Sequence, residues 1–373
     1  MEIKGNKGPA TYFLIELMRV FYDHQAFLQP YGGVSRYFCE LIKSLSYNEK
    51  NYEAMLPPFY SDNLYLMNKR RVILNFKGKI YLLKKLNKGI SKRRLLKNDF
   101  DLFHPTYYDP YFLKYLVKPF VITIHDMIHD LYPQFVNDDG TSQARRLLAQ
   151  KAKKIIAVSE NTKKDIVAIL GIDDKKITVV YPATCMSDKG IEKRVIEEPY
   201  LLYIGERYTY KNFKFFIKAV AGLLCKNKIS LLCGGGKPFS KSELDLLNTL
   251  NLTDFVKHLP ISSDEELASL YRNALAFCYP SLYEGFGIPI LEAFACGCPV
   301  VLSRRSSFPE VAGAAGVYFE PDDASSIVSA LEKVINDRVF RNDIIKIGYQ
   351  QLGKFSWEKA AKQIFNLYKE VLA

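Results

Sequence analysis

The sequence predicts an α/β protein made of two doubly wound domains. Its 373 residues suffice for two domains of ordinary size. Short apolar runs alternate with amphipathic helical segments in both halves, and glycines precede a helix at 32–33 and at 285–287. We predict an N-terminal domain at 1–182, a linker at 183–199, a C-terminal domain at 200–354 and a closing helix at 355–373. Residues 1–17 are a possible extension, because the first strand begins at Met18.

The composition is that of a soluble globular protein, with 48% hydrophobic and 25% charged residues. No apolar run approaches the roughly 20 residues of a membrane-spanning helix, and the N-terminus lacks the order of a signal peptide. The seven cysteines are odd in number and contain no Cys-x-x-Cys pair. This pattern indicates a reduced compartment, without a disulfide framework or a zinc site, so we expect a cytoplasmic protein.

In the N-terminal half, several predicted strands end at polar side chains. Gly32 and Gly33 follow the first strand and precede a helix. Taken alone, two glycines in this place indicate a phosphate-binding loop only weakly, and a tight turn is the alternative. Two later strands end at His104 and His125, at the sheet edge where ligands bind. His125 and His129 are four residues apart and could share a metal on a helix, but no third ligand is evident, so we predict no metal site. The other elements expected here are strands at 154–158 and 177–181 and a helix at 160–170.

The C-terminal half repeats this pattern. A buried strand at 201–204 leads to Arg207 and Lys211, whose charges could complement a diphosphate, although such a pair is usually a solvated surface. Another strand runs into three glycines that begin at Gly234, and a short strand ends at Leu259. The other expected elements are strands at 275–279, 300–302 and 316–319 and helices at 264–272, 324–336, 338–353 and 357–372.

The stretch 279–297 is central, because it runs from a strand through a glycine loop into a short helix, expected from about Pro289 to Cys296. The glycines let the backbone approach a ligand, and the amides of the helix start favour an anion. Glu284 and Glu292 bracket that start. Carboxylates suit sugar hydroxyls better than phosphate, which favours a nucleotide sugar; solvated surface glutamates are the alternative. The donor-binding residues expected in the loop are Gly285, Phe286, Gly287 and Ile288.

The run EGFGIPILEAFACGCPV, in which seven residues separate two glutamates, resembles the signature of the retaining glycosyltransferases of family 4. These enzymes have the GT-B fold, in which two Rossmann-like domains face each other across a cleft. GGVSRYF resembles the glycine loop of the family's N-terminal domain, and Phe355-Ser356-Trp357 resembles the entry to a final helix that crosses back onto that domain. The resemblance extends from about Met18 to the C-terminus.

The resemblance implies a role for each matching residue. Gly32 and Gly33 would adjoin the donor diphosphate, and Arg207 and Lys211 would bind it. The family's arginine commonly follows the strand-end glycine directly, whereas Glu206 takes that place here. The remaining roles are His125 near the donor sugar, Glu284 at the sugar hydroxyls, Glu292 at the ribose, and Gly234 and Leu259 at the nucleobase.

These expectations describe a retaining enzyme that moves a hexose from a UDP- or GDP-sugar to a glycan or lipid-linked acceptor in bacterial surface polysaccharide synthesis. We expect no cofactor and no metal, because two cations and a helix dipole can stabilise the departing diphosphate. A nucleotide-sugar epimerase or phosphorylase of the same fold is the alternative enzyme. A basic nucleic-acid-binding protein is the alternative from another class, but the basic stretch has too few aromatics for stacking, so we expect no nucleic-acid partner. The residues expected to be catalytic are Glu284, His125, Lys211 and Arg207.

The net charge of +12 is concentrated in residues 68–98, which hold twelve Lys/Arg and no Asp/Glu. Within this basic stretch, which extends from Lys69 to Lys97, four apolar residues fall near one helical face: Ile80, Leu83, Leu86 and Ile90. Lys84, Lys85 and Lys88 lie toward the other faces. We therefore expect an amphipathic helix that docks peripherally on an anionic membrane surface, with a solvated helix packed on the N-terminal domain as the alternative.

Overall fold

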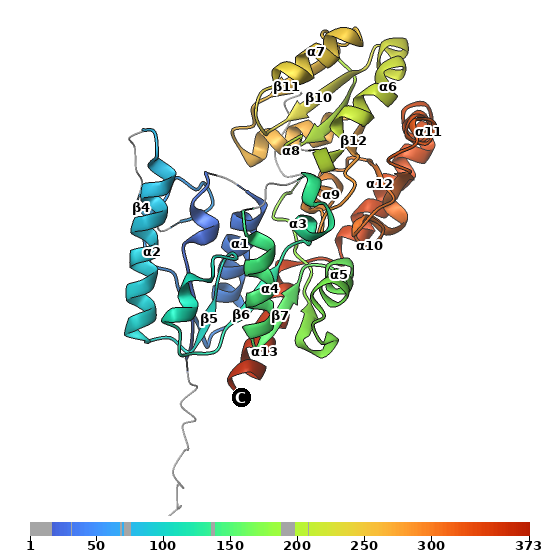
Figure 1. The fold of residues 1–373 in the computed structure, drawn as a ribbon. Helices are drawn as coiled ribbons and strands as arrows, with labels where there is room; N and C mark the ends of the chain where they lie inside the picture. Colours follow the sequence, from blue (N-terminus) through green and yellow to red (C-terminus); the bar gives the residue numbers. More distant parts are fainter. Residues whose placement is uncertain are drawn as a thin grey trace, which may run out of the picture.

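The computed structural model describes residues 17–30, 32–67, 69–70, 76–135, 139–187, 198–207 and 209–373. The possible extension apart from Leu17, residues 71–75 of the basic stretch and residues 188–197 of the expected linker lie outside this part. Two α/β domains face each other, as Figure 1 shows.

The N-terminal domain is built on parallel strands. β2, β1 and β5 form one sheet, β6, β7 and β8 form another, and a bridge from Phe103 to Phe120 joins them. The buried apolar residues of β1 and β6 explain why these runs form central strands. The bounds are β1 Met18–Tyr22, β2 Tyr52–Met55, β5 Leu102–His104, β6 Val121–Ile124, β7 Lys154–Ala157 and β8 Ile177–Val179, with a small pair β3 Phe59–Tyr60 and β4 Lys69–Arg70. The helices are α1 Gly33–Asn48, α2 Lys79–Lys97, α3 Ile128–Leu131, α4 Thr141–Lys151 and α5 Glu160–Leu170.

The C-terminal domain has one parallel sheet in the order β11-β10-β9-β12-β13-β14. The strand order reverses beside β9 and β12, and such a switch point is where ligands bind in open α/β sheets. Its strands are β9 Tyr200–Ile204, β10 Ser230–Gly234, β11 Val256–Leu259, β12 Ala276–Tyr279, β13 Val300–Ser303 and β14 Gly316–Phe319. Its helices are α6 Phe213–Asn227, α7 Lys241–Thr249, α8 Asp264–Asn273, α9 Ile288–Ala295, α10 Phe308–Ala312, α11 Ala324–Asn336 and α12 Arg338–Leu352.

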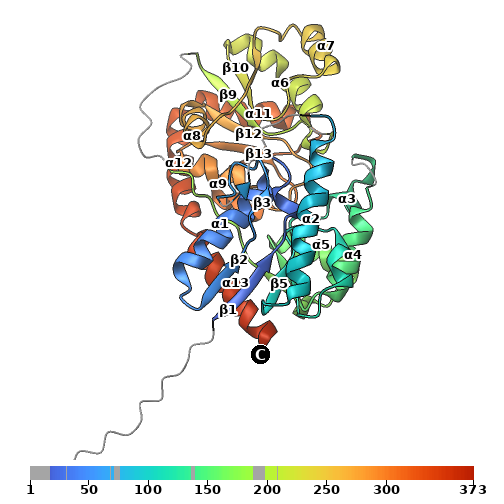
Figure 2. The same ribbon diagram turned by 90° about the vertical axis from the view of Figure 1, so that its left-hand side faces the viewer.

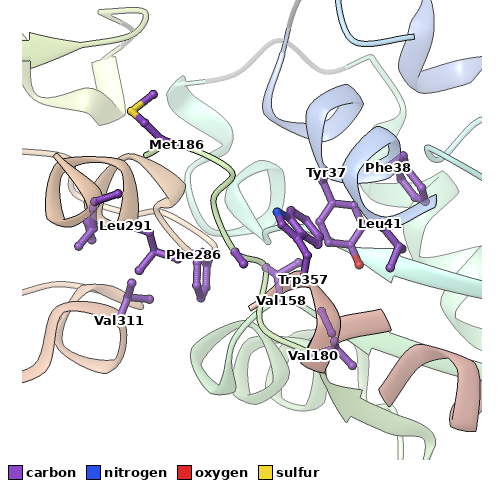
Figure 3. Packing of buried hydrophobic residues seen from close by; sticks show 14 of the residues in the cluster. Tyr37, Phe38, Leu41, Val158, Val180, Met186, Phe286, Leu291, Val311 and Trp357 are labelled. Carbon is purple, nitrogen blue, oxygen red and sulfur yellow. The ribbon is translucent and has the colours of Figure 1, made fainter. Parts of the chain in front are cut away.

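The last helix, α13 (Trp357–Leu372), returns to the N-terminal domain as expected. Figure 3 shows Trp357 next to Tyr37 of α1, and their ring centroids are 5.7 Å apart. Farther along, the Tyr368 hydroxyl hydrogen-bonds to the Tyr22 hydroxyl at 2.9 Å and to His104 Nδ1 at 2.7 Å. His104 is therefore a core residue, and its expected place at the cleft is wrong.

Helix α2 runs along the outer face of the N-terminal domain (Figure 2). Its buried side chains are Leu83, Asn87, Ser91 and Leu95. Asn87 exchanges hydrogen bonds with the backbone of Tyr60, and Ser91 bonds to His24. We expected Leu83 to belong to an apolar face that contacts lipid, and this is wrong because Leu83 packs into the domain. The polar residues Asn87 and Ser91, which bond to the domain, complete the buried face of the helix.

Candidate active site

The glycine loop after β12 is shaped by positions that exclude side chains. Gly287 has a φ of 100°, a left-handed conformation that favours glycine, and it caps α9. A Cβ on Gly285 would lie 1.6 Å from the His125 carbonyl oxygen of the opposite domain. The helix begins one residue before its expected start, at Ile288. Gly285 therefore lets the two domains touch at the point where the motif predicts a ligand.

Side-chain hydroxyls from both domains hold this loop, and none of these contacts was predicted. Ser307 donates to the carbonyls of Glu284 and Phe286, both at 2.9 Å. From the N-terminal domain, Ser159 and Thr162 donate to the Gly285 carbonyl at 2.5 and 3.0 Å. Ser306 accepts from the Glu284 amide, and Ser303 donates to the Ser281 carbonyl. The sequence predicted Ser159 only as a helix cap, because its contact with Gly285 depends on how the two domains are arranged.

Lys211 and Glu284 form an ion pair beside the loop, with the Lys211 ammonium 2.5 Å from a Glu284 oxygen. Both side chains keep a small exposed fraction, 18% and 15%. Lys211 follows β9 and Glu284 follows β12, so the switch point of the sheet brings them together. A cation and a hydrogen-bond acceptor thus lie side by side in the loop that leads into α9.

Glu292 lies one turn inside α9 and is paired across the domain interface. The Arg36 guanidinium of α1 bonds to Glu292 and to Asp264 of α8, both at 3.0 Å. The Tyr271 hydroxyl is 3.3 Å from the other Glu292 oxygen. Burial raises the pKa of Glu292, and the charge of Arg36 opposes that rise. Arg36 belongs to the GGVSRYF run, but its partners could not be predicted because they come from the other domain.

Gly32 and Gly33 lie at the start of α1, one turn before Arg36. Gly32 has an extended backbone and caps the helix. A Cβ on Gly33 would meet nothing within 4 Å. The helix start is therefore open on this side, and the role of both glycines at a diphosphate stays a prediction.

The structure does not bring Arg207 into the group formed by Lys211 and Glu284. Its Nε donates to Glu243 of α7 at 2.8 Å and its Nη2 to the Lys237 carbonyl at 2.6 Å. The guanidinium stacks over Phe239, and the side chain is 4% exposed. Arg207 lies one position later than the arginine of the family pattern, and it binds Glu243 and the Lys237 carbonyl instead of joining Lys211.

His125 lies where the N-terminal domain meets the glycine loop. Its ring packs edge-on against Tyr37 at 4.9 Å, and its buried Nε2 has no hydrogen-bond partner. Burial lowers the pKa of His125 to about 4, so the ring is neutral near pH 7. His129 lies on α3, whereas His125 precedes that helix, so the alternative of two histidines on one helix does not hold.

A cavity of about 630 Å³ lies between the domains next to Arg36. Its walls come from Leu64 and Tyr65 on one side and from Gly235, Pro260 and Ile261 on the other. Of the two residues expected at the nucleobase, Gly234 packs against this wall: a Cβ on Gly234 would be 2.7 Å from Ile204 and 2.8 Å from Ile261. Gly235 and Pro260 of this wall directly follow Gly234 and Leu259, and the role of these two residues at a nucleobase stays a prediction.

Comparison with known proteins supports the resemblance over most of the chain. Residues 31–185 match the family model described as Glycosyltransferase Family 4, and residues 186–351 match Glycosyl transferases group 1. The chain is 27% identical to O-antigen chain mannosyltransferase B of Escherichia coli over 94% of this chain and all of that protein. It is 32% identical to O-antigen chain mannosyltransferase RfbU of Salmonella typhimurium over 59% of this chain and 62% of that protein.

Solved structures share the fold at low identity. Sucrose-phosphate synthase from Thermosynechococcus elongatus superposes with a TM-score of 0.74 at 17% identity, covering 95% of this chain and 99% of that one. Anabaena HepE in complex with UDP-glucose superposes with a TM-score of 0.72, also at 17% identity, covering 95% and 100%. The expected GT-B fold is confirmed.

Proposed function

The chain belongs to the group 1, family 4 glycosyltransferases, and from this premise we propose that it transfers a hexose from a UDP- or GDP-sugar with retention at the anomeric carbon. The acceptor is a glycan or a lipid-linked oligosaccharide of bacterial surface polysaccharide synthesis. The observation that carries the proposal is the Lys211–Glu284 pair in the loop before α9, next to Gly285, whose backbone touches the His125 carbonyl of the other domain. Two relatives named as O-antigen mannosyltransferases support a hexose and this kind of acceptor.

The C-terminal domain holds the donor in this proposal. The diphosphate lies at the N-terminus of α9, where backbone amides and Lys211 face its charge. Glu284 accepts hydrogen bonds from the sugar hydroxyls and Glu292 from the ribose, while the cavity beside Ile261 takes the base. Lys211 already balances Glu284 in the unliganded protein, so an arriving diphosphate competes with that pair for the same ammonium.

The reaction proceeds on one face of the sugar. The bond from the anomeric carbon to the diphosphate oxygen breaks as the acceptor oxygen bonds to the same carbon, and the acceptor proton passes to the leaving phosphate. Lys211 and the helix amides stabilise the charge that the phosphate gains, so we propose no metal requirement and no protein nucleophile. The uncharged ring of His125 packs beside the reacting sugar and offers a hydrogen bond rather than a charge.

The acceptor side of the proposal includes contact with an anionic membrane surface through α2. Among the described residues, no helix is both long and apolar enough to cross a bilayer. On α2, Ile80 and Tyr81 remain 59% and 74% exposed, and Lys85 and Arg93 also point outward. This surface mixes basic and apolar side chains without separating them into two faces, so the proposed attraction to an anionic membrane is mainly electrostatic.

The test of the reaction is a panel of UDP- and GDP-hexoses incubated with saccharide acceptors. Donors that stabilise the protein in a thermal shift are selected first, since a ligand at 100 times its Kd adds about 2.7 kcal/mol. Product analysis by NMR then reports the anomeric configuration. Inverted product would overturn retention, and donor interconversion or phosphorolysis without transfer would favour the epimerase or phosphorylase alternative.

A further inference from the structure

A second cavity, of about 560 Å³, lies wholly within the N-terminal domain. It is bounded by α2, by the segment after β5 and by the start of α4. The volume is in the range of small-molecule sites in proteins. We propose that this cavity is a subsite for one saccharide unit of the acceptor, beyond the unit that receives the hexose. The inference rests on the proposed function, because it assumes a glycan acceptor.

The wall of the cavity carries an aromatic surface suited to a sugar ring. Tyr107 is 37% exposed, and its ring lies over Tyr108 with centroids 4.5 Å apart at 35°. Tyr108 is itself 4% exposed, so it fixes the plane of Tyr107 from behind. A sugar has an apolar C–H face and a polar rim, and an aromatic ring with a hydroxyl at its edge complements both. Tyr107 is thus an anchor held in place before any ligand arrives.

Hydrogen-bonding groups surround this aromatic surface. Asp109 is held by Lys88 at 3.3 Å and by Lys84 at 3.8 Å. Asp139 accepts from the Thr141 amide at 3.0 Å. Among the described residues, neither the Tyr107 hydroxyl nor the Gln143 amide has a hydrogen-bond partner in the protein. Fixed carboxylates accept from hydroxyls, and an amide both donates and accepts.

The charge of the cavity favours a neutral polyol over an anion. The lining carboxylates, Asp109 and Asp139, outnumber the one lining cation, Lys84. Because Lys84 and Lys88 are already paired with Asp109, a phosphate would find no unshared cation among these lining residues and would lie near two carboxylates. An uncharged saccharide avoids both penalties.

One buried residue, Tyr108, contacts both the cavity and the segment of the proposed transfer site. The Tyr108 hydroxyl accepts a hydrogen bond from the backbone amide of His125 at 3.1 Å. Tyr107 and His125 follow the carboxyl ends of β5 and β6, whose sheets are joined by the parallel bridge from Phe103 to Phe120, and therefore lie at the same end of the N-terminal domain. An acceptor of several units can place its terminal sugar near His125 and an inner sugar on Tyr107. A single monosaccharide cannot do both.

The experiment measures kcat/KM for acceptors of one to four units, using mannose, glucose, galactose and N-acetylglucosamine oligosaccharides. For the best series, wild type should favour the tetrasaccharide over the monosaccharide by tenfold or more. Tyr107→Ala should lower that ratio by about tenfold, the size expected for losing one stacked ring and its buried area. Tyr107→Phe should retain most of the ratio, and Gln143→Ala should lower it by about threefold.

Tyr47→Ala is the matched control, because Tyr47 on α1 is 89% exposed and outside the cavity; its ratio should equal that of wild type. Ligand-observed NMR with the same oligosaccharides supplies a readout that needs no turnover. Equal ratios in wild type and Tyr107→Ala, or no saccharide whose binding depends on Tyr107, would overturn the subsite. Failure of wild type to transfer or hydrolyse any nucleotide sugar would instead count against the proposed function.

Discussion

The two sides of the cleft present their candidate residues in different ways. On the C-terminal side, Glu284, the glycines and Glu292 fall within nine consecutive positions of one loop and one helix. On the N-terminal side, Arg36, His125 and Ser159 come from three segments far apart in the chain. The C-terminal groups can therefore be recognised as one local pattern, whereas the N-terminal groups acquire their partners only when the domains meet. The ion pairs follow the same division, because Lys211–Glu284 is internal to one domain and Arg36–Glu292 joins both.

Lys211→Ala should have the largest effect, because it removes the cation proposed to stabilise the leaving phosphate. We expect kcat to fall by about 10²- to 10³-fold, the loss typical of removing one preorganised charge stabiliser. Initial rates are measured for wild type, for Lys211→Ala and for Lys218→Ala, an exposed lysine on α6 that serves as control. Wild type should keep its rate in EDTA. A strict requirement for Mg²⁺ or Mn²⁺ would show that the protein's own cations do not carry this role.

The two glutamates should separate binding from catalysis. Glu284→Gln should lower kcat more than it weakens binding of the free nucleotide, because its proposed partner is the sugar. Glu292→Gln should instead weaken nucleotide binding, and each effect should be about ten- to a hundredfold, since a charge-assisted hydrogen bond contributes roughly 1.5 to 3 kcal/mol.

Titration calorimetry with UDP and GDP, alongside steady-state rates, distinguishes the two outcomes. Arg36→Gln and the double variant Arg36→Gln with Glu292→Gln complete a double-mutant cycle. This cycle gives the interaction energy of the Arg36–Glu292 pair between the domains. Unchanged turnover by both single glutamate variants would place the motif outside the active site.

The fold and the glycine loop before α9 were predictable because their signals are local. Buried strand runs and the glycine-to-proline helix start specified the loop to within one residue. The sequence could not assign His104, since a histidine at a strand end looks the same whether it faces a ligand or bonds to Tyr368 across the core. Nor could it orient α2, because Asn87 and Ser91 complete its buried face through hydrogen bonds rather than apolar contact. The edge strand β2 was missed as well, for it carries an exposed Glu53.

The N-terminal domain should be the more acid-sensitive of the two. Burial lowers the pKa of His104 to about 3 and of His125 to about 4. As the pH falls below about 6.5 the unfolded chain binds protons that the folded domain does not, so the free energy of unfolding decreases, by roughly 2 kcal/mol per histidine between pH 6.5 and 5. Above pH 7 both histidines are neutral in both states, and no such slope should remain.

Urea unfolding followed by Trp357 fluorescence reports this domain, because the only tryptophan of the chain packs on α1. His104→Gln should be less stable than wild type at pH 7.5 but should lose less stability on acidification. A wild-type curve that is flat from pH 7 to 5 would contradict the buried, neutral state of these histidines.

The smallest expected effect concerns the outer face of α2, a basic surface of the N-terminal domain. Lys84 and Lys88 pair with Asp109, so they are poorly placed to bind lipid. Lys85 and Arg93 are exposed, and Lys85 lies one helical turn from the exposed Tyr81. Each such charge near an anionic leaflet contributes up to about 1 kcal/mol to the free energy of membrane binding. We expect less than the full contribution from the two together. The double variant Lys85→Glu with Arg93→Glu should therefore reduce partition onto phosphatidylglycerol vesicles by roughly tenfold at low salt.

The measurement is co-sedimentation at low and at high salt, with the double variant Lys214→Glu and Lys218→Glu on α6 as a control that makes the same change of charge on the other domain. High salt should shrink the difference, because the Debye length falls from about 10 Å at 0.1 M to about 3 Å at 1 M. Apolar insertion of Tyr81 should leave a residual, salt-insensitive fraction that Tyr81→Ser removes. If the α2 and α6 double variants sediment alike, the attraction depends on net charge alone, and α2 is an ordinary solvated helix on the side of its domain.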